Sequence, residues 1–261
     1  MNNNRIKNDL TELKLLGKVK SVTETKFCVL GKYGKKQKED FFIKYIYLFN
    51  ETGNELEEKK YEAEDSLNTR SIYKLNSNGN KIEIAEYKSD SSLDNKYIYK
   101  YDLKGNIVEE CFYNSLNNME TKYTCYYDEN NNLIERNEYN SEGVLKEKHK
   151  LKYDESSNII EMDWLLSNGI IDSKIVYKND NNGNMLEYKS YKENGSLINK
   201  MTFKYDEFNN EIEENEYNSD NKLICSYTSD YTYDNTGNWV TKKELKNGCL
   251  IFITEREIKY Y

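Results

Sequence analysis

One histidine and a few cysteines have the most obvious catalytic chemistry in this sequence. His149 is the single histidine, and Cys111 and Cys125 lie in the same region of the chain. A histidine that activates a cysteine thiolate is the nucleophilic pair of many hydrolases. Each of these three residues, however, substitutes for another residue type of an internal repeat, and no GxSxG, P-loop or Rossmann fingerprint is present. We therefore expect no catalytic residue and no enzymatic activity, with a cysteine hydrolase as the least favoured alternative.

A row of glutamates, each followed four residues later by a large residue that is usually tyrosine, is a candidate binding surface. An acidic, tyrosine-lined sheet surface suits a basic or amphipathic peptide, because tyrosine offers contact area and a polar tip at low entropic cost. The structural alternative is a ladder in which tyrosine hydroxyls donate hydrogen bonds to buried carboxylates. The candidate binding residues are Glu109, Glu135, Glu161, Glu187, Tyr113, Tyr139, Trp164 and Tyr191.

Two further kinds of site have candidate residues. Trp164 and Trp239 are the residues that could stack on a saccharide, and Trp164 is the better placed, although packing also explains both. The turn at 179–184, NDNNGN, is similar in composition to a calcium loop but lacks the following glutamate of the EF-hand pattern. Turn formation already accounts for its Asp and Asn, so we expect no metal site and no cofactor.

An internal repeat must position all of these residues. The asparagine of a Gly-Asn-like dipeptide recurs at intervals of 26, 26, 26, 26, 26, 26 and 28 residues. These asparagines are Asn54, Asn80, Asn106, Asn132, Asn158, Asn184, Asn210 and Asn238. A fixed period of this length indicates one repeat array without a dividing linker. We expect one continuous domain, with an N-terminal cap at 1–49 and the array at 50–261, whose last hairpin, 233–261, is the C-terminal cap.

The residues before each repeat asparagine predict a tight turn. Asp102 can accept backbone N–H bonds two residues on, and Gly105 stands where the turn needs a positive φ, directly before Asn106. The same turn is predicted at Asp234, Gly237 and Asn238. Across the array the positive-φ position holds Gly53, Gly79, Gly105, Asn131, Ser157, Gly183, Asn209 and Gly237. Glycine and asparagine tolerate that conformation best, so the serine is the exception.

Two strands of alternating character fill each repeat. The outgoing strand carries the Glu and Tyr positions, and the return strand ends in alternating large residues such as Met201, Phe203 and Tyr205. Continuing the alternation through the turns places the Glu, Tyr and return-strand aromatic positions on one face. The same count places a row of basic residues, such as Lys122 and Lys148, on the other face.

The predicted fold is all-β. It is an antiparallel meander of about 18 strands from 26-residue β-hairpin repeats, which sheet twist would coil into a single-sheet spiral, shell or open barrel. Residues 9–17 predict a short N-terminal helix with a capping box from Asp9 to Glu12 and Gly17 at its end. An irregular first hairpin follows at 18–27 and 41–49, and 249–261 predicts a long final strand.

Composition narrows the range of partners. The formal net charge of −8 disfavours binding to nucleic acid or anionic membrane. No run approaches the ~18 apolar residues of a membrane span, and the first ten residues contain no apolar leader segment. Five irregularly spaced cysteines without a CxxC motif indicate reduced thiols, which favours the cytoplasm over export. The oligomeric state stays open.

The repeat resembles a known family. The motif Y-D-x-x-G-N stands at Tyr101–Asn106 and Tyr233–Asn238, and in degenerate form at Tyr127, Tyr153 and Tyr205. Residues 18–261 thereby resemble the YD-repeat, or rearrangement-hotspot (RHS) repeat, family, in its short bacterial members without a toxin domain. Large members curl their repeats into a hollow shell around a toxin domain, and this chain resembles the shell part alone. It is also similar, more distantly, to the MORN-like repeat antitoxins.

These patterns together predict a function class. We expect a non-enzymatic repeat scaffold that binds another macromolecule, foremost a protein, through its extended Tyr/Glu-lined sheet surface. One alternative is an immunity or antitoxin protein that neutralises a toxin. Another is a surface carbohydrate-binding or encapsulating element, which requires an export route.

Overall fold

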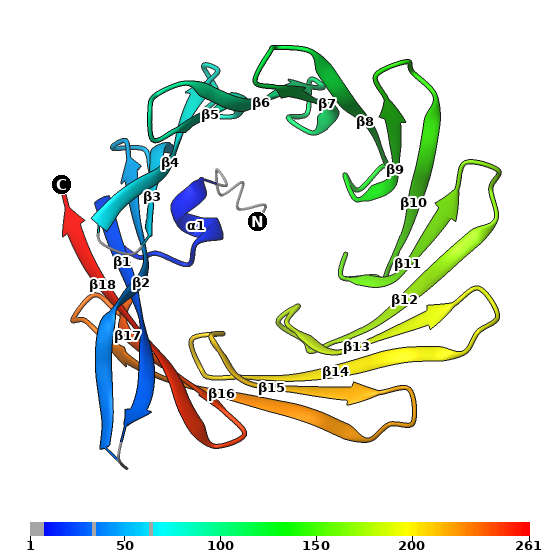
Figure 1. The fold of residues 1–261 in the computed structure, drawn as a ribbon. Coiled ribbons are helices and arrows are strands. Elements are labelled where there is room, and N and C mark those ends of the chain that lie inside the picture. Colours follow the sequence, from blue (N-terminus) through cyan, green and yellow to red (C-terminus); the bar gives the residue numbers. More distant parts are fainter. Residues whose placement is uncertain (1–7, 33–34, 63–64) are drawn as a thin grey trace. The chain divides into compact units, whose positions relative to one another are not determined.

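The computed structural model describes residues 8–32, 35–62 and 65–261 of the chain. These residues form 18 strands and one short helix, so the prediction of an all-β antiparallel meander is confirmed (Figure 1). The sequence predicts no apolar leader in the first ten residues, and residues 1–7 of that segment lie outside the described part. No helix among the described residues is long and apolar enough to span a membrane.

The strands follow the repeat. The first hairpin consists of β1 (Val19–Lys32) and β2 (Lys35–Phe49), and it is preceded by α1 (Asp9–Glu12). The outgoing strands are β3 (Glu55–Glu62), β5 (Lys81–Lys88), β7 (Ile107–Asn114), β9 (Leu133–Asn140), β11 (Ile159–Leu166), β13 (Met185–Lys192), β15 (Glu211–Asn218) and β17 (Trp239–Lys246). The return strands are β4 (Ser66–Leu75), β6 (Leu93–Tyr101), β8 (Met119–Tyr127), β10 (Leu145–Tyr153), β12 (Ile171–Asn179), β14 (Leu197–Tyr205), β16 (Leu223–Tyr233) and β18 (Cys249–Tyr260).

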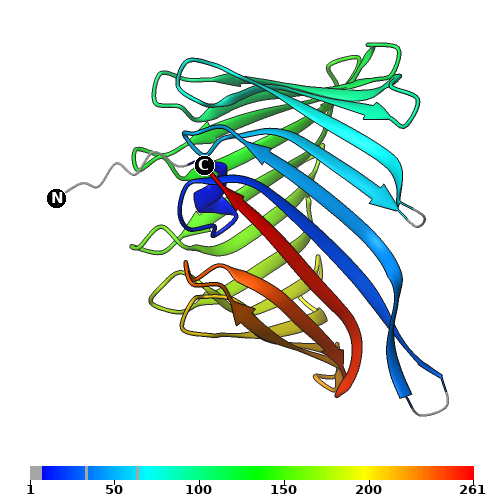
Figure 2. The same cartoon turned by 90° about the vertical axis from the view of Figure 1, so that its left-hand side faces the viewer.

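The chain divides into two compact units. Unit 1 comprises Met1–Tyr97, Asp230–Leu245 and Leu250–Tyr261, and unit 2 comprises Ile98–Ser229 and Lys246–Cys249. In unit 2, strands β7 to β15 pair antiparallel in chain order. In unit 1, β1 pairs with both β2 and β18, so the first and last strands of the chain lie side by side (Figure 2).

The turn predicted from the repeat asparagines is present. The Asp102 Oδ1 atom accepts hydrogen bonds from the backbone N–H groups of Lys104 at 2.9 Å and Asn106 at 2.8 Å. Its Oδ2 atom accepts a bond from the Asn106 side chain at 3.0 Å. Gly105 has φ of 88°, and Ser157, the exception in the sequence, has φ of 64° in the same turn position. Asp234 accepts the equivalent two backbone bonds, so the predicted turn chemistry is confirmed at both places.

The tyrosine of the YD motif, at the end of a return strand, bonds to the start of the outgoing strand beside it. The Tyr127 hydroxyl donates to the Ile107 carbonyl oxygen at 2.8 Å, and the Tyr205 hydroxyl donates to that of Met185 at 2.9 Å. Asn179 donates from its side-chain amide at the equivalent position of another repeat. Burial of the ring raises the pKa of Tyr127 to about 12, which keeps the hydroxyl a donor at neutral pH.

The N-terminal segment differs from its prediction. The N-cap is Asn8, whose side chain accepts the Thr11 N–H, and α1 has only four residues. Asp9 does not cap the helix because its carboxylate accepts the Glu55 N–H at 2.6 Å and pairs with Lys81 at 2.9 Å. The predicted short N-terminal helix is therefore present but ends at Glu12, whereas its extension to Gly17 and its capping box at Asp9 are wrong, and the segment after Glu12 is irregular. Leu10 and Leu15 form a small core with Val19, Val22 and Phe49.

The register of unit 2 defines two faces. On one face Glu187 lies opposite Lys178 and Thr202. We call it the ion-pair face; its charged members are Glu109, Lys122, Glu135, Lys148, Lys150, Lys152, Glu161, Asp163, Lys174, Lys178, Glu187, Lys189, Lys200, Lys204 and Glu213. On the other, Tyr188 lies opposite Tyr177 and Met201. We call it the aromatic face; its members include Glu110, Phe112, Thr121, Tyr123, Cys125, Arg136, Glu138, Glu147, His149, Leu151, Met162, Trp164, Ser173, Ile175, Tyr177, Tyr188, Ser190, Lys192, Asn199, Met201, Phe203, Glu214 and Glu216.

The predicted placement of the glutamate row is wrong. The glutamates share a face with the lysines, not with the return-strand aromatics. The cause is a register shift next to each turn, where Lys178 lies opposite Glu187 but Asn179 lies opposite Met185. The extra residue in the outgoing strand is a β-bulge. A shift of one residue moves every following side chain to the other face.

Candidate binding surface

A stack of rings and charges occupies the part of the aromatic face formed by β7 to β11. The Arg136 guanidinium lies 3.8 Å from the Tyr123 ring centroid and pairs with Glu110 at 3.0 Å. Its register neighbour His149 stacks on Trp164 with ring centroids 4.5 Å apart. The His149 Nε2 atom lies 3.1 Å from a carboxylate oxygen of Glu147. These contacts hold one stacked ring pair and one cation–π pair in fixed positions.

An apolar patch continues across β10 to β14. Leu151 lies opposite Met162, which lies opposite Ile175. Tyr177 and Tyr188 follow with ring centroids 6.2 Å apart. Met201 and Phe203 complete the patch. The members of the patch are half-buried, apart from Phe203, which is 8% exposed, and the neighbouring Trp164 keeps 36% of its surface exposed. The patch is therefore only partly covered by the described residues.

Carboxylates border the apolar patch on both sides. Glu110, Glu138 and Glu147 stand on β7, β9 and β10, and Glu214 and Glu216 stand on β15. The cations that the described strands β7 to β15 place on this face are Arg136 and, at the end of β13, Lys192, which lies opposite Ser173. Glu214 and Glu216 have no hydrogen bond or ion pair with another described residue. The aromatic face of unit 2 therefore combines apolar rings with an excess of negative charge.

The glutamates of the ion-pair face are paired with lysines. Glu109 accepts from Lys100 at 2.6 Å and from Lys122 at 2.7 Å, and these two hydrogen bonds hold its pKa below the usual range. Glu161 pairs in the same way with Lys152 and Lys174, and its pKa is lowered first by the bond from Lys152. The expected ladder of tyrosine hydroxyls on these glutamates is wrong, because lysines occupy the partner positions.

The predicted binding residues divide between the two faces. Trp164 lies on the aromatic face. The others lie on the ion-pair face: Glu109, Glu135, Glu161, Glu187, Tyr113, Tyr139 and Tyr191. Lys148 and Lys189 hold Glu135 and Glu187 at 2.9 and 2.7 Å. A role of these seven residues in binding stays a prediction.

The residues with catalytic potential are not brought together. Cys111 lies on the ion-pair face, whereas Cys125 and His149 lie on the aromatic face with Arg136 between them. Burial raises the pKa of both the Cys111 and Cys125 thiols. A raised pKa keeps a cysteine in its unreactive thiol form.

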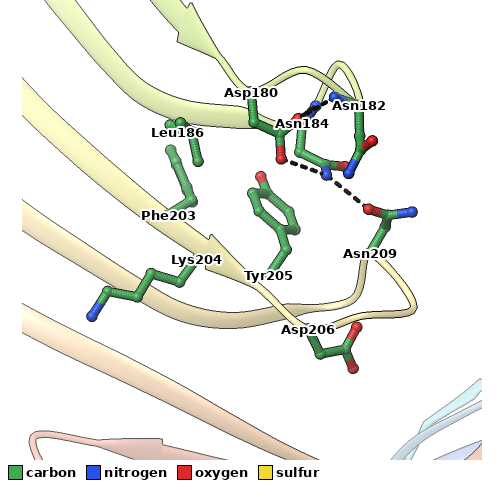
Figure 3. Close-up of a pocket in the computed structure, with 9 residues that line it drawn as sticks. All are labelled: Asp180, Asn182, Asn184, Leu186, Phe203, Lys204, Tyr205, Asp206 and Asn209. Atoms are coloured by element: carbon green, nitrogen blue, oxygen red, sulfur yellow. Dashed lines mark hydrogen bonds between the residues drawn. The ribbon is translucent and has the colours of Figure 1, made fainter.

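A shallow pocket of about 410 Å³ lies at the turn end of the aromatic face (Figure 3). Leu186, Phe203 and Tyr205 line one side, and turn residues line the other. The Asp180 carboxylate accepts the Asn182 and Asn184 N–H groups at 2.8 and 2.9 Å and the Asn184 side chain at 2.9 Å. These bonds are turn chemistry, and no group of three or more acidic, histidine or cysteine side chains in the described residues could hold a metal ion.

Sequence reasoning missed the acidic residues of the aromatic face. Glu110 and Glu214 each follow a glutamate of the predicted row, Glu109 and Glu213. Consecutive strand residues point to opposite faces, so each Glu-Glu pair must place one carboxylate on each side of the sheet. Two consecutive glutamates are therefore the feature of the sequence that predicts a carboxylate on the aromatic face. No comparable feature predicts the position of Arg136.

Comparisons with known proteins give limited information. No family model matches the chain, and no curated protein matches it. Among solved structures, a porin-like protein from Bacteroides uniformis aligns with 94% of this chain and 98% of its own, at TM-score 0.48 and 10% identity. A porin-like protein from Bacteroides vulgatus gives TM-score 0.35 at 13% identity, over 93% of this chain and 98% of its own. The Tc holotoxin pore of Photorhabdus luminescens gives 0.35 at 11% identity, over 88% of this chain but 15% of its own. These likenesses are too slight to assign a function.

Proposed function

We propose that this chain is a non-enzymatic repeat scaffold, related to the YD-repeat proteins, that binds a protein partner on the aromatic face of unit 2. The observation that carries the proposal is the separation of charge between the two faces. Lysines and their paired glutamates fill the ion-pair face, whereas the aromatic face presents Trp164, which is 36% exposed, and half-buried tyrosines beside Glu214 and Glu216, which have no ion pair with another described residue.

Several physical arguments favour the aromatic face as the binding surface. Rings such as Trp164 and Tyr188 bury large areas on contact and lose little side-chain entropy. Exposed ion pairs contribute little free energy and must be partly desolvated when a partner covers them. The aromatic face therefore gains more free energy from contact with a partner than the ion-pair face does. An immunity protein would use the same surface, and a stoichiometric complex with one toxin would identify that role.

Two tyrosines of the same strand provide the test. Tyr188 lies on the aromatic face and Tyr191 lies on the ion-pair face, both in β13. The wild-type chain and the variants Tyr188→Ser and Tyr191→Ser are used for affinity capture from a lysate of the producing cell, with mass spectrometry of what is retained. We expect one protein to be retained by the wild type and by Tyr191→Ser and to be lost with Tyr188→Ser.

The opposite pattern would overturn the proposal. Loss with Tyr191→Ser and retention with Tyr188→Ser would place the partner on the ion-pair face. Failure of the wild type to retain any protein, together with a monomer in solution, would also contradict it. Circular dichroism confirms beforehand that both variants are folded, so that a lost partner reports the surface and not unfolding.

A further inference from the structure

The charges of the aromatic face have a definite spatial order. Glu147 stands on β10 and Glu214 stands on β15, and the apolar patch of Met162, Ile175 and Met201 lies on the strands between them. A ligand that covers this patch therefore passes from one acidic border to the other. A ligand complementary to this surface has an apolar middle and a cationic group near each end.

The strand spacing sets the length of that ligand. From β10 to β15 there are five strand-to-strand steps, and each step is about 4.8 Å, which gives roughly 24 Å across the patch. An α-helix rises about 1.5 Å per residue, so a helix of about 16 residues spans this distance. A helix of that length presents an apolar stripe along one side and can carry basic residues in its first and last turns.

Unit 1 shows the same type of sheet surface covered by a segment of its own chain. Leu10 and Leu15 pack against Val22 and Phe49, with Tyr47 beside them. Tyr47 stands at the repeat position that Tyr177 and Phe203 occupy in unit 2, an exact multiple of 26 residues later. The charge of the covering segment is matched as well, since its Asp9 pairs with Lys81, which lies 4.3 Å from the Tyr73 ring centroid. In unit 1, then, the leucines of the covering segment pack on the apolar face of the sheet, and its Asp9 forms an ion pair with Lys81 of the sheet.

From these observations we infer that the protein partner presents a basic amphipathic helix of about 16 residues, which lies across the apolar patch with its cations on the two carboxylate borders. The inference rests on the proposed function and adds the chemistry of the partner. In unit 2 the sign of the charge is the reverse of that in unit 1, because the sheet supplies the carboxylates and the partner supplies the cations. Glu214 and Glu216 are the residues most available to it, since neither is bound to another described residue.

A synthetic peptide tests the inference directly. The probe is a labelled 16-residue helix with leucines along one side and lysines in its first and last turns, and its dissociation constant for the full-length chain is measured by fluorescence anisotropy. The double variant Glu214→Gln, Glu216→Gln should weaken binding about tenfold. The matched control Glu213→Gln, whose carboxylate lies on the ion-pair face bound to Lys204 at 2.9 Å, should change it less than about twofold.

Two altered peptides complete the experiment. The same peptide with glutamates in place of its lysines should not bind, and an eight-residue version should bind more weakly because it cannot reach both borders. Equal binding of the acidic peptide, or no effect of the double variant, would overturn the basic helix as partner. In that case a capture that still depends on Tyr188 leaves the proposed function intact. Absence of binding by any peptide, with capture independent of Tyr188, would overturn both.

Discussion

Glu213 and Glu214 follow one another in β15 and lie in opposite surroundings. Glu213 accepts a hydrogen bond from Lys204 at 2.9 Å, and this bond is the first cause of its lowered pKa. Glu214 lies opposite Phe203 and Tyr227 and has no cationic partner among the described residues. The same contrast holds for Glu109 and Glu110, except that Arg136 binds Glu110.

The two glutamates show that carboxylates find partners within the sheet on the ion-pair face, whereas some carboxylates of the aromatic face do not. On the ion-pair face, the glutamates Glu109, Glu135, Glu161, Glu187 and Glu213 each accept a bond from a lysine, so the carboxylates of this face are satisfied within the sheet. On the aromatic face, Arg136 pairs with Glu110 and Glu147 lies beside His149, but Glu214 and Glu216 have no hydrogen bond or ion pair with another described residue. A sheet of one layer must cover its apolar face in some way, and unit 1 does so partly with residues 8–18.

The largest effect should come from truncating a ring of the aromatic face. Phe203 is 8% exposed, whereas Val176 on the ion-pair face is 37% exposed. We expect Phe203→Ala to lower the free energy of unfolding by about 3 kcal/mol, because it deletes buried contacts and leaves a cavity. Val176→Ala should cost less than about 1 kcal/mol. Urea unfolding measures both, and equal losses would contradict the difference in packing between the faces.

Carboxylates in the two kinds of surroundings have pKa values shifted in opposite directions, so their effects on stability should depend on pH with opposite sign. Glu55, on the face of unit 1 that carries Phe49, has its pKa raised to about 7, chiefly by burial. Its folded state holds a proton that the unfolded state has lost, so stability falls as the pH rises from about 4.5 to 7. We expect Glu55→Gln to match the wild type at pH 4 and to be more stable at pH 8 by on the order of 2 kcal/mol. A wild-type stability that rises through this pH range, unchanged in the variant, would contradict the assignment.

The ion-pair face has the reverse dependence. The pKa values of Glu109, Glu161 and Glu213 are lowered by lysine hydrogen bonds. Their contribution is present above the unfolded pKa and is lost as the pH falls through the folded values. The triple variant with glutamine at these positions should therefore lose less stability than the wild type between pH 5 and pH 3. Thermal unfolding across that range checks this, and parallel pH curves would show that the ion pairs contribute nothing.

Removal of the hydrogen bond from the Tyr205 hydroxyl should have an intermediate to small effect on the free energy of unfolding. Tyr205→Phe removes the bond to the Met185 carbonyl oxygen and should cost about 1 kcal/mol. Tyr191→Phe, on the ion-pair face of the same unit, is the control and should be close to neutral. If both substitutions are neutral, the tyrosine of the YD motif is retained for packing and not for its bond to the neighbouring strand.

The smallest effect should be that of a single ion pair. Lys204→Met removes the partner of Glu213 and should change the free energy of unfolding by a few tenths of a kcal/mol, as exposed ion pairs do. Urea unfolding at low and high salt measures it. A loss above about 2 kcal/mol would mean that the ion-pair face is a cooperative network, and the contrast between the faces would need revision.

The sequence predicts the repeat and its turns because both depend on local chemistry. Asp102 and Gly105 make the turn that their residue types require, and even Ser157 adopts the positive φ of its position. The faces were predicted incorrectly because the β-bulge beside each turn adds one residue between Lys178 and Glu187. Alternation alone does not reveal it. The N-cap was missed because Asp9 binds Glu55 and Lys81, contacts of high sequence separation that no local pattern shows.

The central claim is that a partner binds the aromatic face and not the ion-pair face, and site-specific photocrosslinking tests it most directly. A photoreactive phenylalanine analogue is placed at Tyr188 in one sample and at Tyr191 in another, and each is irradiated in the lysate of the producing cell. The account predicts one discrete crosslinked protein from position 188 and none from position 191. A crosslink from position 191 with none from position 188 would contradict it.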